Sequence, residues 1–190
     1  MVEAPIISTP IDAIPSACVP FYLLTPNQRE VLQYLSEGLT SSEIGTKRGG
    51  NSRRTVETHK RNIRYIGYID SNIYFPDEYE NQERLTLLAL IRDGISHGYL
   101  THDLPQMPVQ TLTPREKEVL ELAAQGKRHS EIARALNIAQ KTVEAHMGNV
   151  HKKLHTKNTY HALARTTYLT VHSLWPTPAE TSQASCYKQD

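Results

Sequence analysis

The chain of 190 residues carries a formal net charge of +1 and only two cysteines, Cys18 and Cys186. Its length suits one or two small domains, no run approaches the roughly 20 apolar residues of a membrane span, and the N-terminus lacks the pattern of a secretory signal. Two cysteines make neither a disulfide framework nor a metal-ligand spacing, so the composition excludes membrane and disulfide-rich secreted proteins, and we expect a cytoplasmic protein.

Residues 1–20 have a proline at every fifth position, from Pro5 to Pro20. Proline at this density disfavours a helix and favours an extended arm. The arm is either a passive tail or a segment that contacts the body of the protein or a partner.

Residues 21–98 are expected to form a first helical unit. Thr25 caps a first helix and Gly38 ends it, Thr40 begins a capping box for a second helix, and Ser52 can cap a third. The residues expected to face inward are apolar and recur at helical spacing: Val31, Leu32, Leu35, Val56, Ile63 and Ile66.

An acidic and aromatic insertion near residues 69–80 precedes the fourth helix of this unit, which is expected at about 81–97 and ends at Gly98. The insertion is either a loop pinned by its own aromatic side chains or a surface for a protein partner, because exposed aromatic residues favour interfaces. Residues 99–111 contain two prolines and are expected to be a linker.

Residues 112–172 are expected to form a second helical unit. Its first helix is capped by Thr113 and ended by Gly126, and a tight turn at 137–139 joins a second helix to a third at about 140–154. The remaining segments are a fourth helix at about 158–172 and a flexible Pro-, Ser- and Thr-rich tail at 173–190.

The two units repeat one pattern. The run LTP recurs at an offset of 88 residues, at Leu24 and Leu112, and the run TVE recurs after the turn at an offset of 87, at Thr55 and Thr142. The first unit therefore has one extra residue in its turn.

The turn of the first unit departs from the repeat. Where the second unit has Leu136 and Ile138, the first offers Arg48 or Gly49 and Asn51. Two apolar contacts are missing, so this turn is expected to be looser.

The second unit closely resembles the DNA-binding domain of LuxR-type (GerE-type) bacterial regulators. The residues that carry the resemblance are Leu112, Thr113, Arg115, Glu116, Glu118-Val119-Leu120, Gly126, Glu131-Ile132-Ala133, Leu136, Ile138, Thr142-Val143, His146, Asn149-Val150 and Lys153-Leu154. The resemblance and the repeat together imply an all-α fold, with two tandem four-helix LuxR-type helix-turn-helix domains joined by a short linker.

Positive charge gathers at the two turn-plus-third-helix segments. Residues 41–65 contain seven basic and two acidic residues, and residues 127–157 contain the same numbers. Since the whole chain is nearly neutral, the remaining residues are acidic on balance. Basic patches of this kind attract the phosphate backbone of nucleic acids.

The third helices are the expected DNA-reading elements, because the second helix of a helix-turn-helix enters the major groove. The resemblance implies that the residues after the Thr-Val pair, with one a turn later, face the bases: Glu57, Thr58, Arg61, Glu144, Ala145 and Gly148. Candidate phosphate contacts are Arg53, Arg54, Thr55, Arg64, Lys141, Thr142 and Lys152, and Asn62 and Asn149 complete the set of candidate DNA-binding residues.

The base-facing residues differ between the units. Arg61 is suited to guanine, whereas Glu144 can accept from cytosine N4 and Ala145 can touch a thymine methyl group. Many relatives have a long polar residue at the position of Gly148, so the second unit is expected to read fewer bases.

We expect no metal, no cofactor and no enzyme activity. His151 and His155 have a ligand spacing, but the helix should end near Leu154 and no cysteine or carboxylate completes a set. Neither a nucleophile–base pair, a phosphate-binding loop nor paired catalytic carboxylates occur in the sequence.

We therefore expect a sequence-specific DNA-binding transcriptional regulator that binds double-stranded DNA and lacks a sensory domain. The alternative is a protein-interaction module or co-regulator that binds another regulator or RNA polymerase through its first domain. The resemblance implies pairing through the fourth helices, either between two chains as a homodimer or within one chain as a pseudo-dimer. The homodimer is favoured, because identical patches are self-complementary under two-fold symmetry.

Overall fold

The computed structural model describes residues 21–50, 52–70, 79–102 and 109–175, and these residues form helices and connecting turns with no strand among them. The expected all-α fold is confirmed. The helices are η1 Phe21–Leu23, α1 Pro26–Ser36, α2 Ser41–Lys47, α3 Arg53–Asp70, α4 Tyr79–Ser96, α5 Pro114–Ala124, α6 His129–Ala135, α7 Gln140–Leu154 and α8 Thr159–Val171.

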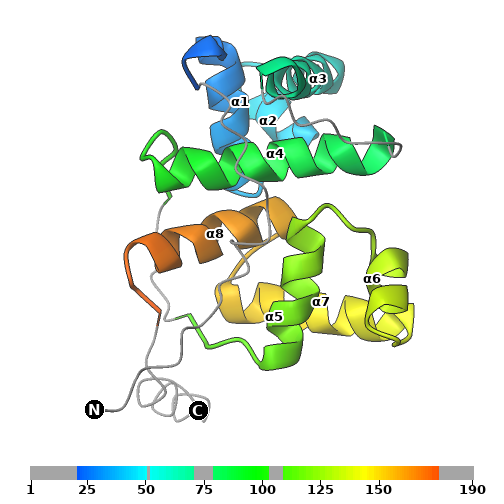
Figure 1. The fold of residues 1–190 in the computed structure, drawn as a ribbon. Coiled ribbons are helices and arrows are strands. Elements are labelled where there is room, and N and C mark those ends of the chain that lie inside the picture. Colours follow the sequence, from blue (N-terminus) through cyan, green and yellow to red (C-terminus); the bar gives the residue numbers. More distant parts are fainter. Residues whose placement is uncertain (1–20, 51, 71–78, 103–108, 176–190) are drawn as a thin grey trace.

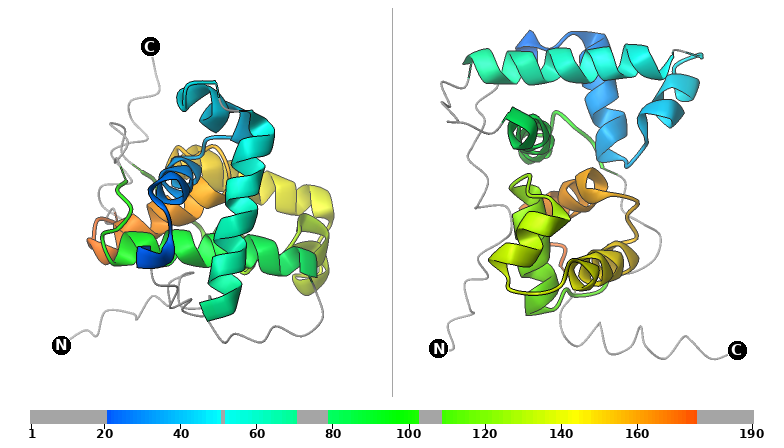
Figure 2. Two further views of the ribbon diagram at one scale, coloured as in Figure 1. Left: turned by 90° about the horizontal axis from the view of Figure 1, so that it is seen from above. Right: turned by 90° about the vertical axis from the view of Figure 1, so that its right-hand side faces the viewer.

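The fourth helices α4 and α8 lie side by side in the middle of the molecule (Figure 1). Helices α1 to α3 cover one side of this pair and α5 to α7 cover the other, and the side view in Figure 2 shows the same layers. Two buried apolar clusters follow from this arrangement. One is centred on α1, α3 and α4, and the other on α5, α6 and α7.

Threonine caps begin three of these helices, as the sequence predicts. The backbone N–H of the third helical residue donates to the capping hydroxyl of Thr25, Thr40 and Thr113 in α1, α2 and α5. In each case the side chain of that third residue accepts from the backbone N–H of the threonine, which completes a capping box.

Gly38 and Gly126 end α1 and α5 in the same geometry. Both have a left-handed backbone, with φ of 82° and 81°. The N–H of Gly126 donates to Ala123 O and that of Lys127 to Leu122 O, at 3.1 and 3.2 Å. This is the Schellman arrangement that a glycine permits, and it turns the chain sharply into the next helix.

Arg48 anchors the turn of the first unit at the position that Leu136 holds in the second. Its guanidinium donates to Glu30 Oε2 at 2.8 Å and to Asn27 Oδ1 at 2.7 Å. Only 7% of its side chain is exposed. The missing apolar contact is therefore replaced by a polar one, while the expected looseness of the turn stays a prediction.

In the second unit an arginine also joins the first helix to the end of the second helix, but it comes from the first helix. Arg115 in α5 donates to Glu118 at 2.7 Å and to the backbone oxygen of Leu136 at 3.0 Å. Glu118 and Glu30 are equivalent positions of the repeat. Both units thus tie the end of their second helix to their first helix through a guanidinium.

The structure pairs the two fourth helices within one chain. Leu88 and Ile91 of α4 share a buried cluster with Leu163 and Ala164 of α8, and all four side chains are fully buried. The sequence analysis favoured pairing of like helices between two chains. Within one chain these residues of α4 and α8 therefore cover one another, and the homodimer stays a prediction.

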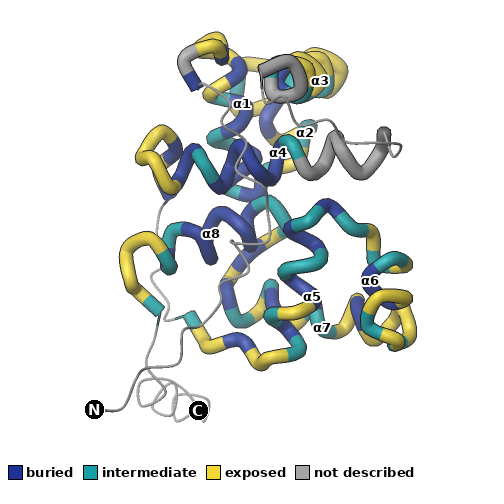
Figure 3. The backbone as a smooth tube through the Cα atoms, viewed as in Figure 1, coloured by how far each residue is buried: buried dark blue, intermediate teal, exposed yellow. Residues whose placement is uncertain are grey.

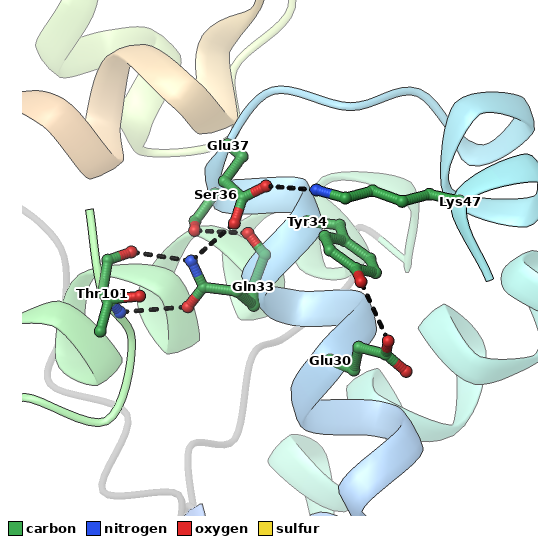
Figure 4. Close-up of polar contacts among 7 residues, drawn as sticks. All are labelled: Glu30, Gln33, Tyr34, Ser36, Glu37, Lys47 and Thr101. Atoms are coloured by element: carbon green, nitrogen blue, oxygen red, sulfur yellow. Dashed lines mark hydrogen bonds and ion pairs between the residues drawn. The ribbon is translucent and has the colours of Figure 1, made fainter. Parts of the chain in front are cut away.

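The described ends of the segment 99–111 pack against the units that they join. Figure 4 shows Gln33 of α1 bonded twice to the backbone of Thr101, at 2.8 Å to its oxygen and 3.1 Å from its N–H. Phe21 stacks on Tyr99 with ring centroids 5.0 Å apart. At the other end the N–H of Gln110 donates to Lys153 O at 3.0 Å. The linker expected at 99–111 stays a prediction, and its residues 103–108 lie outside the described ones.

Three other expectations concern residues outside the described ranges: the arm at 1–20, most of the insertion near 69–80, and the tail beyond Trp175. Residues 173–175 of that tail are described, and Ser173 and Leu174 are exposed. Trp175 lies against the core of the second unit and its indole N–H donates to Thr170 at 3.0 Å.

Candidate nucleic-acid interface

Helices α6 and α7 form a helix-turn-helix in the second unit. Asn137 adopts a left-handed backbone with φ of 51°, and the N–H of Ile138 donates to Ala133 O at 3.0 Å. This turn redirects the chain so that α7 packs across α5 and α6. The expected start at Gln140 and end at Leu154 are confirmed.

One face of α7 is buried and the opposite face is open. Its buried side chains are Val143, Met147, Val150 and Leu154. The open face carries Lys141, Ala145, Gly148 and Lys152, which are exposed except for the partly exposed Gly148. These four residues are spaced by four, three and four, so they form a single stripe along the helix. We call it the α7 face.

The α7 face is flat in its middle and basic at its ends. Ala145 and Gly148 are small, and a Cβ atom placed on Gly148 would meet no atom within 4 Å. Internal packing therefore does not require glycine here, although glycine inside a helix costs about 1 kcal/mol relative to alanine. Lys141 and Lys152 border this flat section with positive charge.

Helix α3 presents the equivalent stripe in the first unit, which we call the α3 face. It consists of Arg54, Thr58, Arg61 and Tyr65, all of them exposed. The α3 face is bulkier and more polar than the α7 face. Figure 3 shows the exposed residues running along the outer side of α3. Figures 1 and 2 place α3 and α7 at opposite ends of the molecule, with α4 and α8 between them.

Tyr65 belongs to the α3 face, although it is not among the DNA contacts expected from the sequence. Its side chain is 64% exposed. The sequence could have identified Tyr65 as a candidate contact, because it lies four residues after Arg61 and aligns with Lys152 in the repeat. A hydroxyl at this position can donate to a phosphate or sugar oxygen.

Glu57 and Glu144 occupy equivalent positions but different environments. Glu57 is half-buried, accepts from Ser41 Oγ at 2.6 Å and pairs with Lys60 at 3.1 Å. Burial alone would raise the pKa of Glu57, but these two partners outweigh it and hold the pKa below the usual value. Glu144 is exposed and accepts from Gln140 at 3.1 Å. Glu57 thus joins α2 to α3, whereas Glu144 faces solvent.

The other predicted contacts lie near these stripes. Arg53, Thr55, Asn62, Thr142 and Asn149 are exposed. The hydroxyl of Thr55 is 3.0 Å from that of Ser52, which caps α3 as expected. Arg64 is half-buried, and its charge helps to lower the pKa of Glu57.

Some of the basic residues counted in the two segments stabilise the fold. Lys153 pairs with Glu116 at 2.7 Å, and Lys60 pairs with Glu57. Burial would raise the pKa of Glu116, but Lys153 and the N–H of Thr113 reverse the effect and lower it. Lys60 and Lys153 therefore contribute to the fold, and the exposed stripes carry part of the positive charge that remains available to a nucleic acid.

The described residues contain no group of three or more His, Cys, Asp or Glu side chains arranged to hold a metal ion. His151 is one of the two histidines with a ligand spacing in the sequence, and its Nδ1 lies 2.9 Å from the hydroxyl of Thr156. Within the same ranges, no helix is both long enough and apolar enough to cross a membrane.

An exposed, basic second helix supported by a short first helix and a buried core is the arrangement of helix-turn-helix DNA-binding proteins. The family model described as bacterial regulatory proteins, luxR family, matches residues 22–65 and 110–165, which is more than half of the chain. The chain belongs to this family. In the first unit the match ends within α3, so α4 lies outside it.

The chain is also similar to curated bacterial proteins. It is 46% identical over 80 residues to the transcriptional activator protein BjaR1 of Bradyrhizobium diazoefficiens, covering 42% of this chain and 32% of that protein. It is 42% identical over 72 residues to the uncharacterized response regulatory protein YgeK of Escherichia coli, covering 33% and 49%. It is 38% identical over 106 residues to the transcriptional activator protein CarR of Pectobacterium carotovorum, covering 54% and 42%. The match spans half or less of each relative, and no solved structure matches the chain.

Proposed function

We propose that this protein is a sequence-specific DNA-binding transcriptional regulator and that α7 is its principal recognition helix. The observation that carries the proposal is the α7 face, an open stripe on the second helix of a helix-turn-helix with a lysine at each end. Its flat centre allows a helix to lie close to the floor of the major groove, where alanine contacts thymine methyl groups.

We propose further that residues 21–98 and 112–172 are two tandem LuxR-type domains and that the α3 face is a second DNA-binding surface. The split family match and the equivalent caps and turns of the two units support this division. Arg54 and Arg61 supply charge on the α3 face, and Arg61 is long enough to pair with a guanine. Relatives named as transcriptional activators support a role in transcription.

Mobility-shift titrations on genomic fragments at several salt concentrations test the proposal. Affinity should fall by about 0.9 log unit per log unit of salt for each phosphate that is neutralised. Lys152→Ala should weaken binding evenly across fragments and reduce that slope by about 0.9. Lys117→Ala is the matched control, because it removes one positive charge from α5 and not from the α7 face. A salt-independent complex, or equal effects of both variants, would contradict the assignment of the α7 face.

The α3 face is tested separately with Arg61→Ala. If Arg61 pairs with a base, the variant should relax preference at one position, at a cost of about 1–3 kcal/mol. Sites selected from a random pool with both proteins provide the comparison. An unchanged preference would mean that the first unit does not read bases through Arg61, and would favour the alternative in which this unit binds a protein.

A further inference from the structure

The contact between α4 and α8 is the most extensive helix–helix contact in the described structure. Its apolar part joins Leu88 and Ile91 to Leu163 and Ala164, none of which is accessible to solvent. Ala164 belongs to the buried cluster centred on the first unit and not to that of its own unit. The outward face of α8 is therefore already occupied by α4. We call this contact the internal seam.

Polar contacts fix the seam at the start of α8. Asn158, which caps α8, donates from Nδ2 to the backbone oxygen of Gly38 at 3.0 Å. Gly38 lies directly on His161, so that a Cβ atom at Gly38 would be 2.7 Å from His161 Nδ1. The turn between α1 and α2 thus fits closely over the first turn of α8, which only glycine permits at this distance.

Further contacts continue along α8. The ring of His102 meets that of His161 edge-on, with centroids 5.4 Å apart. Arg165 donates from Nε to His102 Nε2 at 3.1 Å and from Nη1 to Leu154 O at 2.7 Å. Tyr168, one turn beyond Arg165, lies 6.0 Å from His102 between ring centroids. The seam therefore extends over about three turns of α8 and combines apolar packing with directional hydrogen bonds.

The two exposed stripes beside this seam are not equivalent. The α3 face carries Thr58 and Arg61 where the α7 face carries Ala145 and Gly148. A two-fold homodimer through like fourth helices would present identical recognition helices to identical half-sites. A chain whose two fourth helices cover each other instead presents two different recognition helices, α3 and α7.

We propose that this protein binds DNA as a single chain at a non-palindromic site, with its first unit in the place that a second subunit would take. The inference rests on the proposed function, because it specifies the class of DNA that the proposed regulator binds. Among the described side chains, most of α4 from Leu87 to Ile95 and most of α8 are buried, so this part of each helix is already covered within the chain.

Sedimentation of the full chain, alone and with a labelled duplex selected from a random pool by the same chain, tests the inference. The free protein should sediment at 21.5 kDa, the complex should contain one chain per duplex, and the selected sites should lack an inverted repeat. A free species of twice this mass, or two chains on an inverted repeat, would overturn it. If no duplex is selected, the proposed DNA-binding function is wrong. The mass of the free protein tests only the single-chain inference, so the two failures can be distinguished.

Ala164→Glu examines the seam directly, because it places a carboxylate in the buried contact with the first unit. Val171→Glu is the matched control, since Val171 lies at the exposed end of the same helix. The first variant should lose thermal stability or self-associate, while the control should behave as the unchanged chain does. An Ala164→Glu protein that is as stable and as monomeric as the control would show that the seam does not determine the assembly state.

Discussion

Replacing Arg48 by alanine is expected to destabilise the turn of the first unit. Arg48 makes an ion pair with Glu30 at 2.8 Å and a hydrogen bond to Asn27 at 2.7 Å, with 7% of its side chain exposed. Removing one partner of a fully buried ion pair costs about 3–5 kcal/mol. Here 43% of the Glu30 side chain is exposed, so water can replace the lost guanidinium. We therefore expect a loss of about 1.5–2 kcal/mol, the lower part of the range for hydrogen bonds to a charged group.

Native-state hydrogen exchange measures this loss at the turn itself. The N–H groups of Arg48, Gly49 and Gly50 donate to Ile44, Thr46 and Gly45, and all of these bonds depend on the end of α2 staying folded. A loss of 1.4 kcal/mol in local opening corresponds to about tenfold faster exchange. Amides of the equivalent turn in the second unit are the internal reference and should not change.

Lys47→Ala is the matched control for this experiment. Lys47 pairs with Glu37 at 3.3 Å, but half of its side chain is exposed. An exposed pair of this kind contributes about 0–1 kcal/mol. If Arg48→Ala and Lys47→Ala accelerate exchange equally, the buried guanidinium is not what holds the turn, and the reasoning from its contacts is wrong.

Two further predictions concern ionisable groups. Glu116→Gln should keep the capping box of α5, since Gln28 fills the same position in the capping box of α1. The variant should lose the 2.7 Å ion pair with Lys153. Urea denaturation at pH 7 should therefore show a free energy of unfolding lower by about 1–2 kcal/mol. Because the pKa of Glu116 is lowered on folding, its contribution is present above about pH 4.5 and is lost as the pH falls through the lowered pKa, so the difference between variant and parent should vanish in acid. Burial, with the neighbouring Arg165 charge, lowers the pKa of His161 to about 3. Below about pH 6.5 the histidine of the unfolded chain therefore takes up a proton, while His161 of the folded chain stays neutral. The free energy of unfolding should consequently fall as the pH drops from 6.5 toward 3. An NMR titration in which His161 protonates near pH 6.5 would refute this.

The helix ends follow from local sequence. Thr25, Thr40 and Thr113 begin helices, and Gly38 and Gly126 end them, as expected. These features depend on a few neighbouring residues, because a cap satisfies backbone groups within one turn and a left-handed glycine needs no distant partner. The all-α class and the inward stripes could be predicted for the same reason.

The sequence identified the positions where the first unit departs from the repeat but not what replaces the missing contacts. Arg48 and Glu30 are 18 residues apart, and their pairing depends on the angle at which α2 packs against α1. The half-burial of Glu57 against Ser41 has the same origin, since it requires α3 to lie beside α2. The resemblance to LuxR-type domains implied a base contact at Glu57, which stays a prediction, and the structure adds a contact of its carboxylate with Ser41 of another helix.

The choice of partner for each fourth helix was decided by the tertiary structure alone. The sequence determined that both helices have an apolar face, because apolar residues recur at helical spacing, and Leu88, Ile91 and Leu163 are indeed fully buried. The hydrophobic effect is not directional, so such a face does not specify what covers it. The contact between Asn158 and Gly38, 120 residues apart, and the close approach of Gly38 to α8 make the partner specific. These contacts exist only once the two units are placed against each other within one chain.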